Sequence, residues 1–557
     1  GNWMWPAKLP GEGSRIYDAA VATRDLMIDL GIAIDGGKDS LSMATKVDQE
    51  IVKSPGELAI SAYVSVPNIE KVITPDIKEA GSSSLWYIDL GESKCRLGGS
   101  ALAQTLGQLG NECPDVEKSH TLKNFFKAVQ IMIDRDVLLA GHDRSDGGLV
   151  TTILEMAFAG NCGLDLQIKN KKDPLAFFFN EELGYVAEVK KEKEKEFKKV
   201  IKKFGLDKLT QCLGKTREDG LIQIQYNKRN LLKTENYQLR QIWEETSYQL
   251  NRLQTNPEVA LAEKENIQKR SGQRYQVSFV PKNTTREKLA KNRPKVAIIR
   301  EEGSNGDREM SSAFHTAGFE VWDVSMSDLL QGRINLKNFR GLAFVGGFSY
   351  ADVFGSAKGW ASSIKYSPKL KQMFDDFYHR PDTFSLGVCN GCQLMASIGW
   401  IPWKGIEIKK QPRLGRNKSG RFESRWASVK INPSPSIMLR GMENSTLGIW
   451  VAHGEGQFIF PDAKVLMETK KQKLMPVMFV DDEGQATEKY PFNPNGSEGG
   501  LAGLCSPDGR HLAMMPHPER AFLKWQWSWM PETMKKDLKA SPWLKMFQNA
   551  YAWCKNN

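Results

Sequence analysis

The residues best suited to covalent chemistry lie between Gly387 and Gln393, where the chain reads Gly-Val-Cys-Asn-Gly-Cys-Gln. An apolar run at 384–388 predicts a strand before Cys389, and residues 393–398 predict a helix after it. Glycines stand two residues before and two residues after the cysteine. This spacing permits the sharp turn of a G-x-S-x-G elbow, with sulfur in place of oxygen. A helix N-terminus behind the sulfur favours the thiolate and offers N–H donors to an oxyanion, so the pattern predicts a nucleophile.

A general base for this nucleophile is present near the C-terminus, in the segment Met-Pro-His-Pro-Glu-Arg at 515–520. His517 follows a strand-like run at 511–515, and Glu519 stands two residues after the histidine. A single histidine of this kind is more often a hydrogen-bonded core residue than a base. A nearby carboxylate and a credible nucleophile reverse that preference. We therefore predict a triad of Cys389, His517 and Glu519.

The pair Cys389-x-x-Cys392 has two other interpretations. It could be a redox or metal-binding pair, or Cys389 could be a buried structural cysteine. The sequence holds no second Cys-x-x-Cys, which argues against a four-cysteine zinc site. A thioredoxin-type motif is expected near the first βαβ unit of a chain, whereas this pair follows several predicted strands. The nucleophile is the preferred interpretation, and the other two remain alternatives.

Three segments together resemble the class I glutamine amidotransferases, which use a catalytic triad: 346–352, 387–393 and 516–519. Further segments resemble the glutaminase domain of the phosphoribosylformylglycinamidine synthase family in particular, namely 347–360, 419–423 and 452–456. One departure is Ala351, where many bacterial relatives carry glycine. The resemblance implies that glutamine is hydrolysed and that its ammonia is retained.

The neighbourhood of the nucleophile supplies further candidates. We expect the backbone N–H groups of Gly347, Phe348 and Asn390 to form an oxyanion hole. The resemblance implies that Gln393 contacts the substrate glutamine. His453 is a weaker candidate, because a lone histidine after a strand is at least as often structural or at a domain interface.

The N-terminal half carries short glycine and aspartate clusters but no G-x-x-x-x-G-K-[ST] loop, which argues against a P-loop ATPase. Segments 9–13 and 36–43 offer flexible backbone, a cation and hydroxyls to a phosphate. Segment 97–100 precedes a helix whose N-terminus could hold an anion. Segment 142–148 places two aspartates in a glycine-rich turn, which could bind Mg²⁺ or cap a helix. By pattern alone, each of these segments is more often an ordinary turn.

All four segments resemble the second synthetase half of the same family, whose fold is similar to that of aminoimidazole ribonucleotide synthetase. The resemblance implies that Asp143 is a Mg²⁺ ligand and that Ser145 contacts a nucleotide. It also implies that Lys38 binds substrate or phosphate, and we expect Gly99 and Ser100 to contact nucleotide or substrate as well.

The organisation of the chain predicts α/β and α+β domains in succession. Residues 1–82 resemble the remnant of a synthetase-like ATP-binding domain, and 83–235 predict a synthetase-like C-terminal domain of the aminoimidazole ribonucleotide synthetase type. Residues 236–293 predict a helical segment (236–265) and a polar linker. Residues 294–557 predict a doubly wound, flavodoxin-like α/β glutaminase.

Composition narrows the function classes. The formal net charge is +11, but basic residues do not interleave with aromatics in one motif, so we expect no nucleic-acid partner. No apolar run is long enough for a membrane span, so no membrane partner is expected. Eight cysteines without disulfide-framework spacing suit a reducing, cytoplasmic location.

The resemblance as a whole implies amidation of formylglycinamide ribonucleotide to formylglycinamidine ribonucleotide in purine biosynthesis. ATP and glutamine would be consumed, Mg²⁺ would be the cofactor, and ammonia would pass internally between two sites. The chain opens in what resembles domain interior, so we expect a missing N-terminal part of the same enzyme to complete the ATP site. The alternative is a fragment that hydrolyses glutamine, cannot synthesise, and acts as a binding or regulatory partner.

Overall fold

The computed structural model describes residues 1–285 and 292–557. It divides into two compact units, Gly1–Ile242 and Trp243–Asn557, with the division inside helix α7 (Asn236–Gln254). Within the described ranges, no helix has the length and apolar character needed to cross a membrane.

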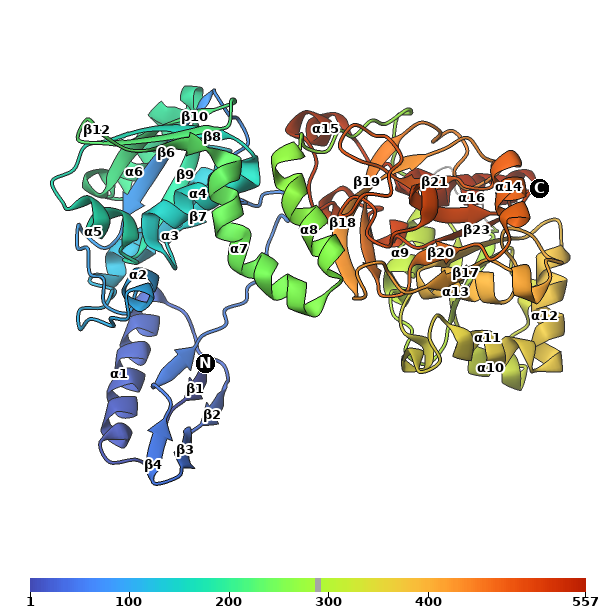
Figure 1. The fold of residues 1–557 in the computed structure, drawn as a ribbon, viewed down its shortest axis with the longest axis horizontal. Coiled ribbons are helices and arrows are strands. Elements are labelled where there is room, and N and C mark those ends of the chain that lie inside the picture. Colours follow the sequence, from blue (N-terminus) through green and yellow to red (C-terminus); the bar gives the residue numbers. More distant parts are fainter. Residues whose placement is uncertain (286–291) are drawn as a thin grey trace. The chain divides into compact units, whose positions relative to one another are not determined.

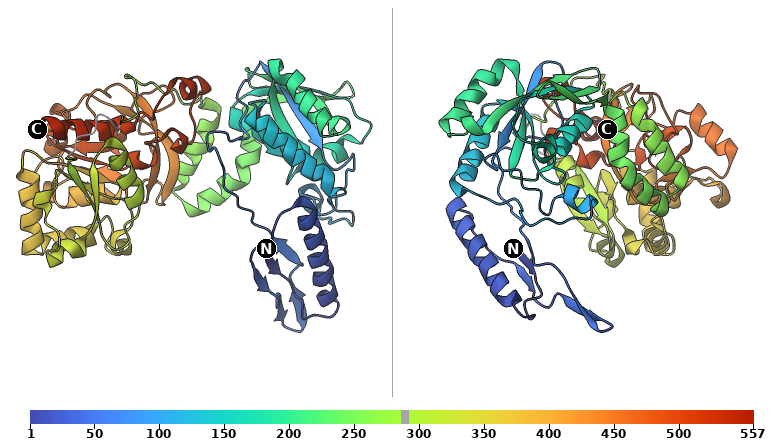
Figure 2. Two further views of the ribbon diagram at one scale, coloured as in Figure 1. Left: turned by 180° about the vertical axis from the view of Figure 1, so that it is seen from behind. Right: turned by 60° about the vertical axis from the view of Figure 1, so that its left-hand side comes forward.

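The first unit begins with short strands. β1 (Asn2–Met4) lies between β2 (Lys38–Ser40) and β5 (Glu57–Ala59), and α1 (Glu12–Leu30) lies beside this sheet (Figures 1 and 2). β3 (Ala44–Val47) and β4 (Glu50–Lys53) form a separate hairpin. β5 ends at Ala59, because the apolar residues beyond it are exposed and find no neighbouring strand among the described residues.

A seven-stranded sheet forms the larger part of the first unit, in the order β12-β11-β8-β10-β6-β9-β7. Neighbouring strands are antiparallel except β8 and β11, which are parallel. This sheet confirms the predicted α+β portion. Its strands are β6 (Ser83–Asp89), β7 (Leu138–Asp143), β8 (Gly163–Ile168), β9 (Gly184–Lys190), β10 (Thr210–Arg217), β11 (Leu221–Tyr226) and β12 (Arg229–Glu235).

Helices cover both faces of this sheet. Along β6, Leu85 and Tyr87 join one core cluster with α4 (Gly148–Gly160) and α5 (Pro174–Phe179). The alternating residues Trp86 and Ile88 join a second cluster with α3 (Ser119–Asp134) and α6 (Glu194–Lys203). Alternation along the strand therefore builds two cores, one on each face. The helix that follows segment 97–100 is the short α2 (Ala101–Thr105), because Gly107 and Gly110 adopt positive φ angles beyond it.

The helical pattern over 236–265 forms two helices instead of one, α7 and α8 (Pro257–Asn266). Pro257 cannot donate to the hydrogen-bond ladder of α7, so it begins a new helix. Asn256 caps that helix by accepting the Glu258 N–H at 3.1 Å. The linker expected after residue 268 lies partly outside the described residues.

The second unit is built on a nine-stranded sheet, in the order β14-β13-β15-β16-β23-β22-β21-β18-β19. Its first five strands are parallel: β13 (Lys295–Arg300), β14 (Glu320–Ser325), β15 (Gly341–Phe344), β16 (Phe384–Val388) and β23 (His511–Met514). Numbered along the chain, this is the 2-1-3-4-5 order of flavodoxin-like sheets, which carry their sites at the carboxyl ends of the strands. The predicted doubly wound fold is confirmed.

Helices pack on this parallel sheet in two groups. α9 (Asp307–Ala317) packs with α16 (Leu544–Asn556), whereas α11 (Lys358–Lys365) packs with α12 (Pro368–His379) and α13 (Asn390–Ser397). α10 (Met326–Gln331) packs on α12. Because helices cover both faces, central strand residues such as Leu342, Leu386 and Leu512 are fully buried.

The remaining strands of the large sheet form an antiparallel extension that the sequence patterns did not predict. They are β18 (Glu423–Ile431), β19 (Thr446–His453), β21 (Val477–Phe479) and β22 (Leu501–Cys505). β17 (Arg413–Gly415) pairs with β20 (Gln457–Ile459), and α14 (Ala463–Lys471) and α15 (Glu532–Asp537) complete the unit. β19 ends beside the predicted nucleophile, so this extension supplies part of the site.

Leu386 tests the core that supports this sheet. Leu386→Ala should lower the free energy of unfolding of the second unit by about 2–5 kcal/mol, because it leaves a cavity at the centre of β16. Urea denaturation measures the change. The control Ile408→Ala alters a side chain that is 87% exposed and should stay within about 0.5 kcal/mol of wild type. Equal effects of the two variants would contradict the assigned core.

Candidate active site

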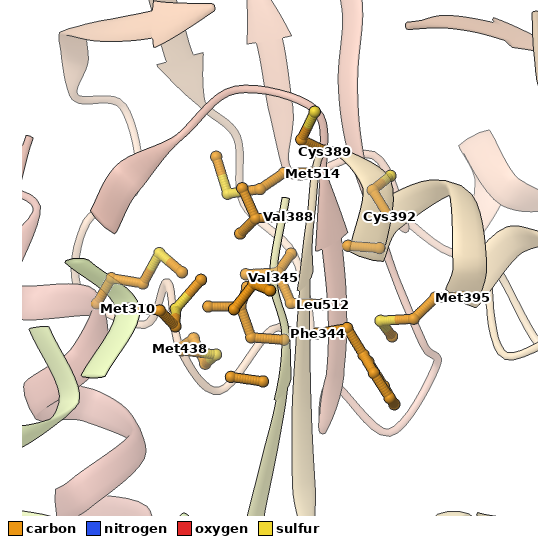
Figure 3. Close-up of a cluster of buried hydrophobic side chains, with 14 of the residues drawn as sticks. Met310, Phe344, Val345, Val388, Cys389, Cys392, Met395, Met438, Leu512 and Met514 are labelled. Atoms are coloured by element: carbon orange, nitrogen blue, oxygen red, sulfur yellow. The ribbon is translucent and has the colours of Figure 1, made fainter. Parts of the chain in front are cut away.

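Cys389 stands at a strained turn between β16 and α13, at the N-cap position of the helix. Its backbone angles, φ 54° and ψ −108°, lie outside the regions that L-residues ordinarily adopt. A Cβ at Gly387 would lie 2.5 Å from a methionine sulfur, and one at Gly391 would lie 2.1 Å from a backbone oxygen of β15. Both glycines are therefore required by close packing. Figure 3 shows the Cys389 side chain beyond Val388, at the end of the strand.

His517 and Glu519 lie in the segment that follows β23. His517 Nδ1 and Glu519 Oε1 are 2.6 Å apart, and both side chains are almost fully buried. The carboxylate can only accept, so Nδ1 carries the shared proton and Nε2 faces another partner. Nε2 has no hydrogen-bond partner in the described part of the chain. The backbone N–H of His517 donates to the Trp450 carbonyl at 2.9 Å, which ties this segment to β19.

Gly346 is the position where the cysteine and the histidine meet. It follows β15, whereas Cys389 follows β16 and His517 follows β23, and these three strands are adjacent in the sheet. A Cβ at Gly346 would lie 2.9 Å from His517 Cε1 and 3.4 Å from Cys389 Cβ. Both side chains therefore lie next to the backbone of Gly346, which has no side chain to separate them.

Opposing effects set the charge of His517. Burial lowers the pKa of the imidazole, but the carboxylate of Glu519 and the sulfur of Cys389 outweigh burial and raise this pKa to about 9. The imidazolium form is therefore favoured at neutral pH. His453 shows the opposite result, because burial and then the charge of His517 lower the pKa of His453 to about 3.

The three expected oxyanion donors differ in availability. Gly347 adopts φ 128°, and no backbone acceptor for its N–H occurs within the described residues. The Asn390 N–H lies in the first turn of α13, where helical N–H groups lack an intrahelical acceptor. The Phe348 N–H instead donates to the Gly303 carbonyl at 2.9 Å, because segment 303–305 pairs with segment 346–348. The backbone N–H groups of Gly347 and Asn390 are therefore available to an oxyanion, whereas the Phe348 N–H is bonded to the Gly303 carbonyl.

Gln393 is held by the protein itself. Its Nε2 donates to the Glu455 carbonyl at 2.7 Å, and its Oε1 accepts from Asn390 Nδ2 at 2.9 Å. These bonds fix segment 453–456 against the first turn of α13. Contact between Gln393 and a substrate glutamine stays a prediction.

Asn417 organises the same segment and was missed from the sequence. Its Oδ1 accepts the Gly456 N–H at 3.0 Å, and its Nδ2 donates to the His453 carbonyl at 2.7 Å. His453 Nδ1 lies 3.2 Å from Asn417 Oδ1, so Nδ1 is the protonated nitrogen of this ring. The segment begins next to Ala452, whose carbonyl accepts from the Cys389 sulfur at 3.4 Å. These contacts give His453 a structural role. No local pattern marks Asn417, because its partners lie far along the chain.

Cys392 lies one turn along α13 (Figure 3), and its side chain is fully buried. Burial, and then the charge of Cys389, raise the pKa of the Cys392 thiol well above its ordinary value. All eight cysteines are free. Among the residues that the structure describes, no group of three or more His, Cys, Asp or Glu side chains could hold a metal ion. The raised pKa disfavours a thiolate at Cys392, and the nucleophile assignment of Cys389 stays a prediction.

Two of the predicted anion-binding segments of the first unit, 97–100 and 142–148, lie on loops that meet at Glu181. Ser100 caps α2 through its hydroxyl, and Gly99 precedes it with φ 73°. Glu181 Oε1 accepts the N–H groups of Ala101 and Gly147, at 2.8 Å each. The carboxylate of Glu181 therefore accepts an N–H group at the start of α2, and a role of Gly99 and Ser100 in binding nucleotide or substrate stays a prediction. No sequence signal marked Glu181.

Asp143 and Ser145 contact each other at the end of β7. The Ser145 hydroxyl donates to Asp143 Oδ2, and Asp143 Oδ1 lies 3.2 Å from a ring nitrogen of His142. Partial burial raises the pKa of Asp143, but the Ser145 hydroxyl and its neighbours outweigh burial, and the net shift is downward. Lys38 lies on β2, where its Nζ donates to the Ser40 hydroxyl. Within the described ranges, no hydrogen bond or ion pair joins Lys38 to these loops.

Magnesium binds through several oxygen ligands, and Asp143 is one exposed carboxylate outside any larger ligand group in the described residues. The residues present therefore do not form a complete Mg²⁺ site by themselves. A ligand role for Asp143 stays a prediction that needs further carboxylates.

Comparison with known proteins gives three family matches. Residues 293–554 match the CobB/CobQ-like glutamine amidotransferase domain. Residues 1–65 match the FGAR-AT PurM_N-like domain, and residues 90–227 match the C-terminal domain of AIR synthase related proteins. The matches agree with the amidotransferase fold of the second unit and the synthetase-like α+β fold of the first.

Three similar proteins carry the name phosphoribosylformylglycinamidine synthase. The chain is 53% identical to the probable phosphoribosylformylglycinamidine synthase, chloroplastic/mitochondrial, of Arabidopsis thaliana, over 99% of this chain and 40% of that protein. It is 48% identical to the synthase of Dictyostelium discoideum, over 100% of this chain and 44% of that protein. It is 49% identical to the human synthase, over 99% of this chain and 42% of that protein.

The chain is homologous to part of the phosphoribosylformylglycinamidine synthases. It spans about two fifths of the length of these relatives. The predicted resemblance to this synthase family is thereby confirmed along nearly the whole chain.

Gly346 tests the geometry of the cysteine and histidine pair in this synthase homologue. Gly346→Ala should slow alkylation of Cys389 by iodoacetamide by about 10²-fold, because the added methyl displaces the imidazole that favours the thiolate. The matched control is Gly454→Ala, whose Cβ would come no closer than 3.8 Å to another group. Equal rates in both variants would contradict the assigned geometry.

His517 should link the stability of the second unit to pH. Its pKa is about 9 in the folded state and 6.5 when unperturbed, so the folded chain holds this proton more tightly. The resulting stabilisation is fully present below pH 6.5 and is lost as pH rises through 9. Urea unfolding of wild type between those pH values should show a larger decline than in His517→Gln. The same decline in both proteins would contradict the raised pKa.

Proposed function

We propose that this chain hydrolyses glutamine at Cys389 and supplies the ammonia for amidation of formylglycinamide ribonucleotide. The observation that carries the proposal is the meeting of the strained cysteine and the carboxylate-bound histidine at Gly346. The family matches and the names of the relatives support the same assignment.

The first half of the proposed reaction forms a thioester. The Cys389 thiolate attacks the side-chain carbonyl carbon of glutamine, and the carbonyl oxygen becomes an oxyanion. The N–H groups of Gly347 and Asn390 would stabilise that charge, and one such donor contributes about 10²–10³-fold in rate. His517, protonated and held by Glu519, gives its proton to the departing nitrogen, which leaves as ammonia.

The second half releases glutamate. His517, now neutral, takes a proton from water, and the resulting hydroxide attacks the thioester carbon; the C–S bond then breaks, which releases glutamate and returns the Cys389 thiolate beside the protonated His517. The same two backbone donors stabilise the second oxyanion. Glu519 keeps the proton on Nδ1 throughout, so that Nε2 exchanges protons with the reacting atoms.

The synthetase part of the proposal extends beyond this chain's own residues. ATP would activate the amide oxygen of formylglycinamide ribonucleotide, ammonia would replace it, and ADP, phosphate and formylglycinamidine ribonucleotide would result. Lys38, Gly99, Ser100, Asp143 and Ser145 are the positions proposed to serve nucleotide, substrate or Mg²⁺. Any anion at Gly99 and Ser100 must displace or lie beside Glu181. Bound Mg²⁺ would neutralise phosphate charge.

The domain boundaries at 82, 235 and 293 and a cytoplasmic location are part of the same proposal. The free cysteines suit a reducing compartment. The name of the Arabidopsis relative gives plastids and mitochondria, which are further compartments to test.

Glutamate release from glutamine tests the proposal. Cys389→Ala should abolish release, because no other thiol stands at the elbow. The matched control Cys392→Ala removes the second cysteine of the same motif and should retain release within about 10-fold, with some loss of stability. A redox pair would instead need both cysteines, so equal loss in both variants would overturn the nucleophile assignment. Adding ATP and formylglycinamide ribonucleotide then tests whether this chain couples hydrolysis to synthesis.

A further inference from the structure

Two carboxylates lie beside the first turn of α13 and are not used by the triad. Asp352 Oδ1 accepts from Asn390 Nδ2 at 3.4 Å, and Asn390 directly follows the nucleophile. The Glu455 carboxylate accepts the backbone N–H and the hydroxyl of Ser356, and its backbone carbonyl accepts from Gln393 at 2.7 Å. We call Asp352 and Glu455 the acidic pair. Both members are thus tied to the residues around Cys389.

The acidic pair holds negative charge that the protein does not neutralise. Neither carboxylate forms an ion pair with a Lys, Arg or His within residues 1–285 and 292–557. Burial, and then the negative charge of Glu455, raise the pKa of Asp352 above its usual range. The other groups that act on Asp352 are neutral donors from Ala357 and Asn390. Two carboxylates that repel each other without a neutralising cation destabilise a half-buried site. The binding of a cationic ligand would relieve this repulsion.

An unsatisfied buried hydroxyl next to the acidic pair also points to a ligand. The Ser349 hydroxyl is 1% exposed and has no partner in the described part of the chain. The Ser349 N–H donates to Asn390 Oδ1 at 3.3 Å, so this residue belongs to the same hydrogen-bonded group as Asp352. Buried polar groups of this kind are ordinarily paired, here by a polar ligand.

We infer that Asp352 and Glu455 bind the α-ammonium group of the substrate glutamine. The inference rests on the proposed glutaminase function and names its specificity determinants. A glutamine whose side-chain amide faces Cys389 must place its ammonium group a few bonds away. The acidic pair, joined to Asn390 and Gln393 on the same helical turn, offers the complementary charge there. Asp352 and Glu455 would thus select glutamine over amides that lack an α-amino group.

The experiment compares glutamine with 4-carbamoylbutanoate, which is glutamine without its α-amino group. Wild type should prefer glutamine by about 10²-fold in kcat/KM. Asp352→Asn and Glu455→Gln should each lower kcat/KM for glutamine by about 10- to 100-fold, mainly through KM, and leave the des-amino amide nearly unchanged. The matched control is Glu302→Gln, which removes an exposed carboxylate near Tyr350. It should preserve the preference.

Equal losses for both amides would overturn the inference, because they would indicate that the acidic pair only positions the loop. If the chain does not hydrolyse glutamine, the proposed function is wrong, but the inference about the acidic pair can still be tested by a second measurement. Labelling of Cys389 by a glutamine chloroketone and by its des-amino counterpart reports recognition without turnover. Wild type should react faster with the first, and both acidic-pair variants should lose that difference. Equal labelling rates in wild type would overturn the inference.

Discussion

The active site depends on the backbone conformation of one residue, Cys389. A non-glycine residue at φ 54° and ψ −108° carries strain of about 1–3 kcal/mol, which only tight surroundings maintain. Those surroundings are the buried strand β16, the first turn of α13, and Gly387 and Gly391, where a side chain would clash with neighbouring atoms. The same turn points the sulfur away from the core and brings the Asn390 N–H next to it. The parallel sheet then sets the remaining geometry, because β15 and β23 flank β16 and deliver Gly346 and His517 to the same end.

Charge in the site follows from which groups are buried together. His517 and His453 are both buried, yet one pKa rises to about 9 and the other falls to about 3. The difference is the partner: His517 faces the Glu519 carboxylate, whereas His453 is bound to the neutral amide of Asn417. Burial without a countercharge disfavours an imidazolium, and burial beside a carboxylate favours it. One histidine is therefore suited to proton transfer, and the other to holding segment 453–456.

Much of the second unit was predictable because its signals are local. The elbow needs only a strand, two glycines and a helix in succession, and the parallel strands appear as short apolar runs at βαβ spacing. The antiparallel extension was missed because β21 and β22 are short and lack an alternating pattern. The single helix predicted over 236–265 was wrong although Pro257 marks the break. Asn417 and Glu181 could not be predicted, since their partners come from distant segments. The hydrogen bond from the Phe348 N–H to the Gly303 carbonyl could not be predicted for the same reason.

The most direct test of the account is the covalent state of Cys389 during exposure to glutamine. Rapid acid quenching followed by peptide mass spectrometry should show a glutamyl group on the peptide that contains Cys389. Because His517 supports both halves of the reaction, His517→Gln should form this adduct slowly and retain it for longer than wild type. A glutamyl adduct on another cysteine, or glutamate release without any adduct at Cys389, would contradict the account.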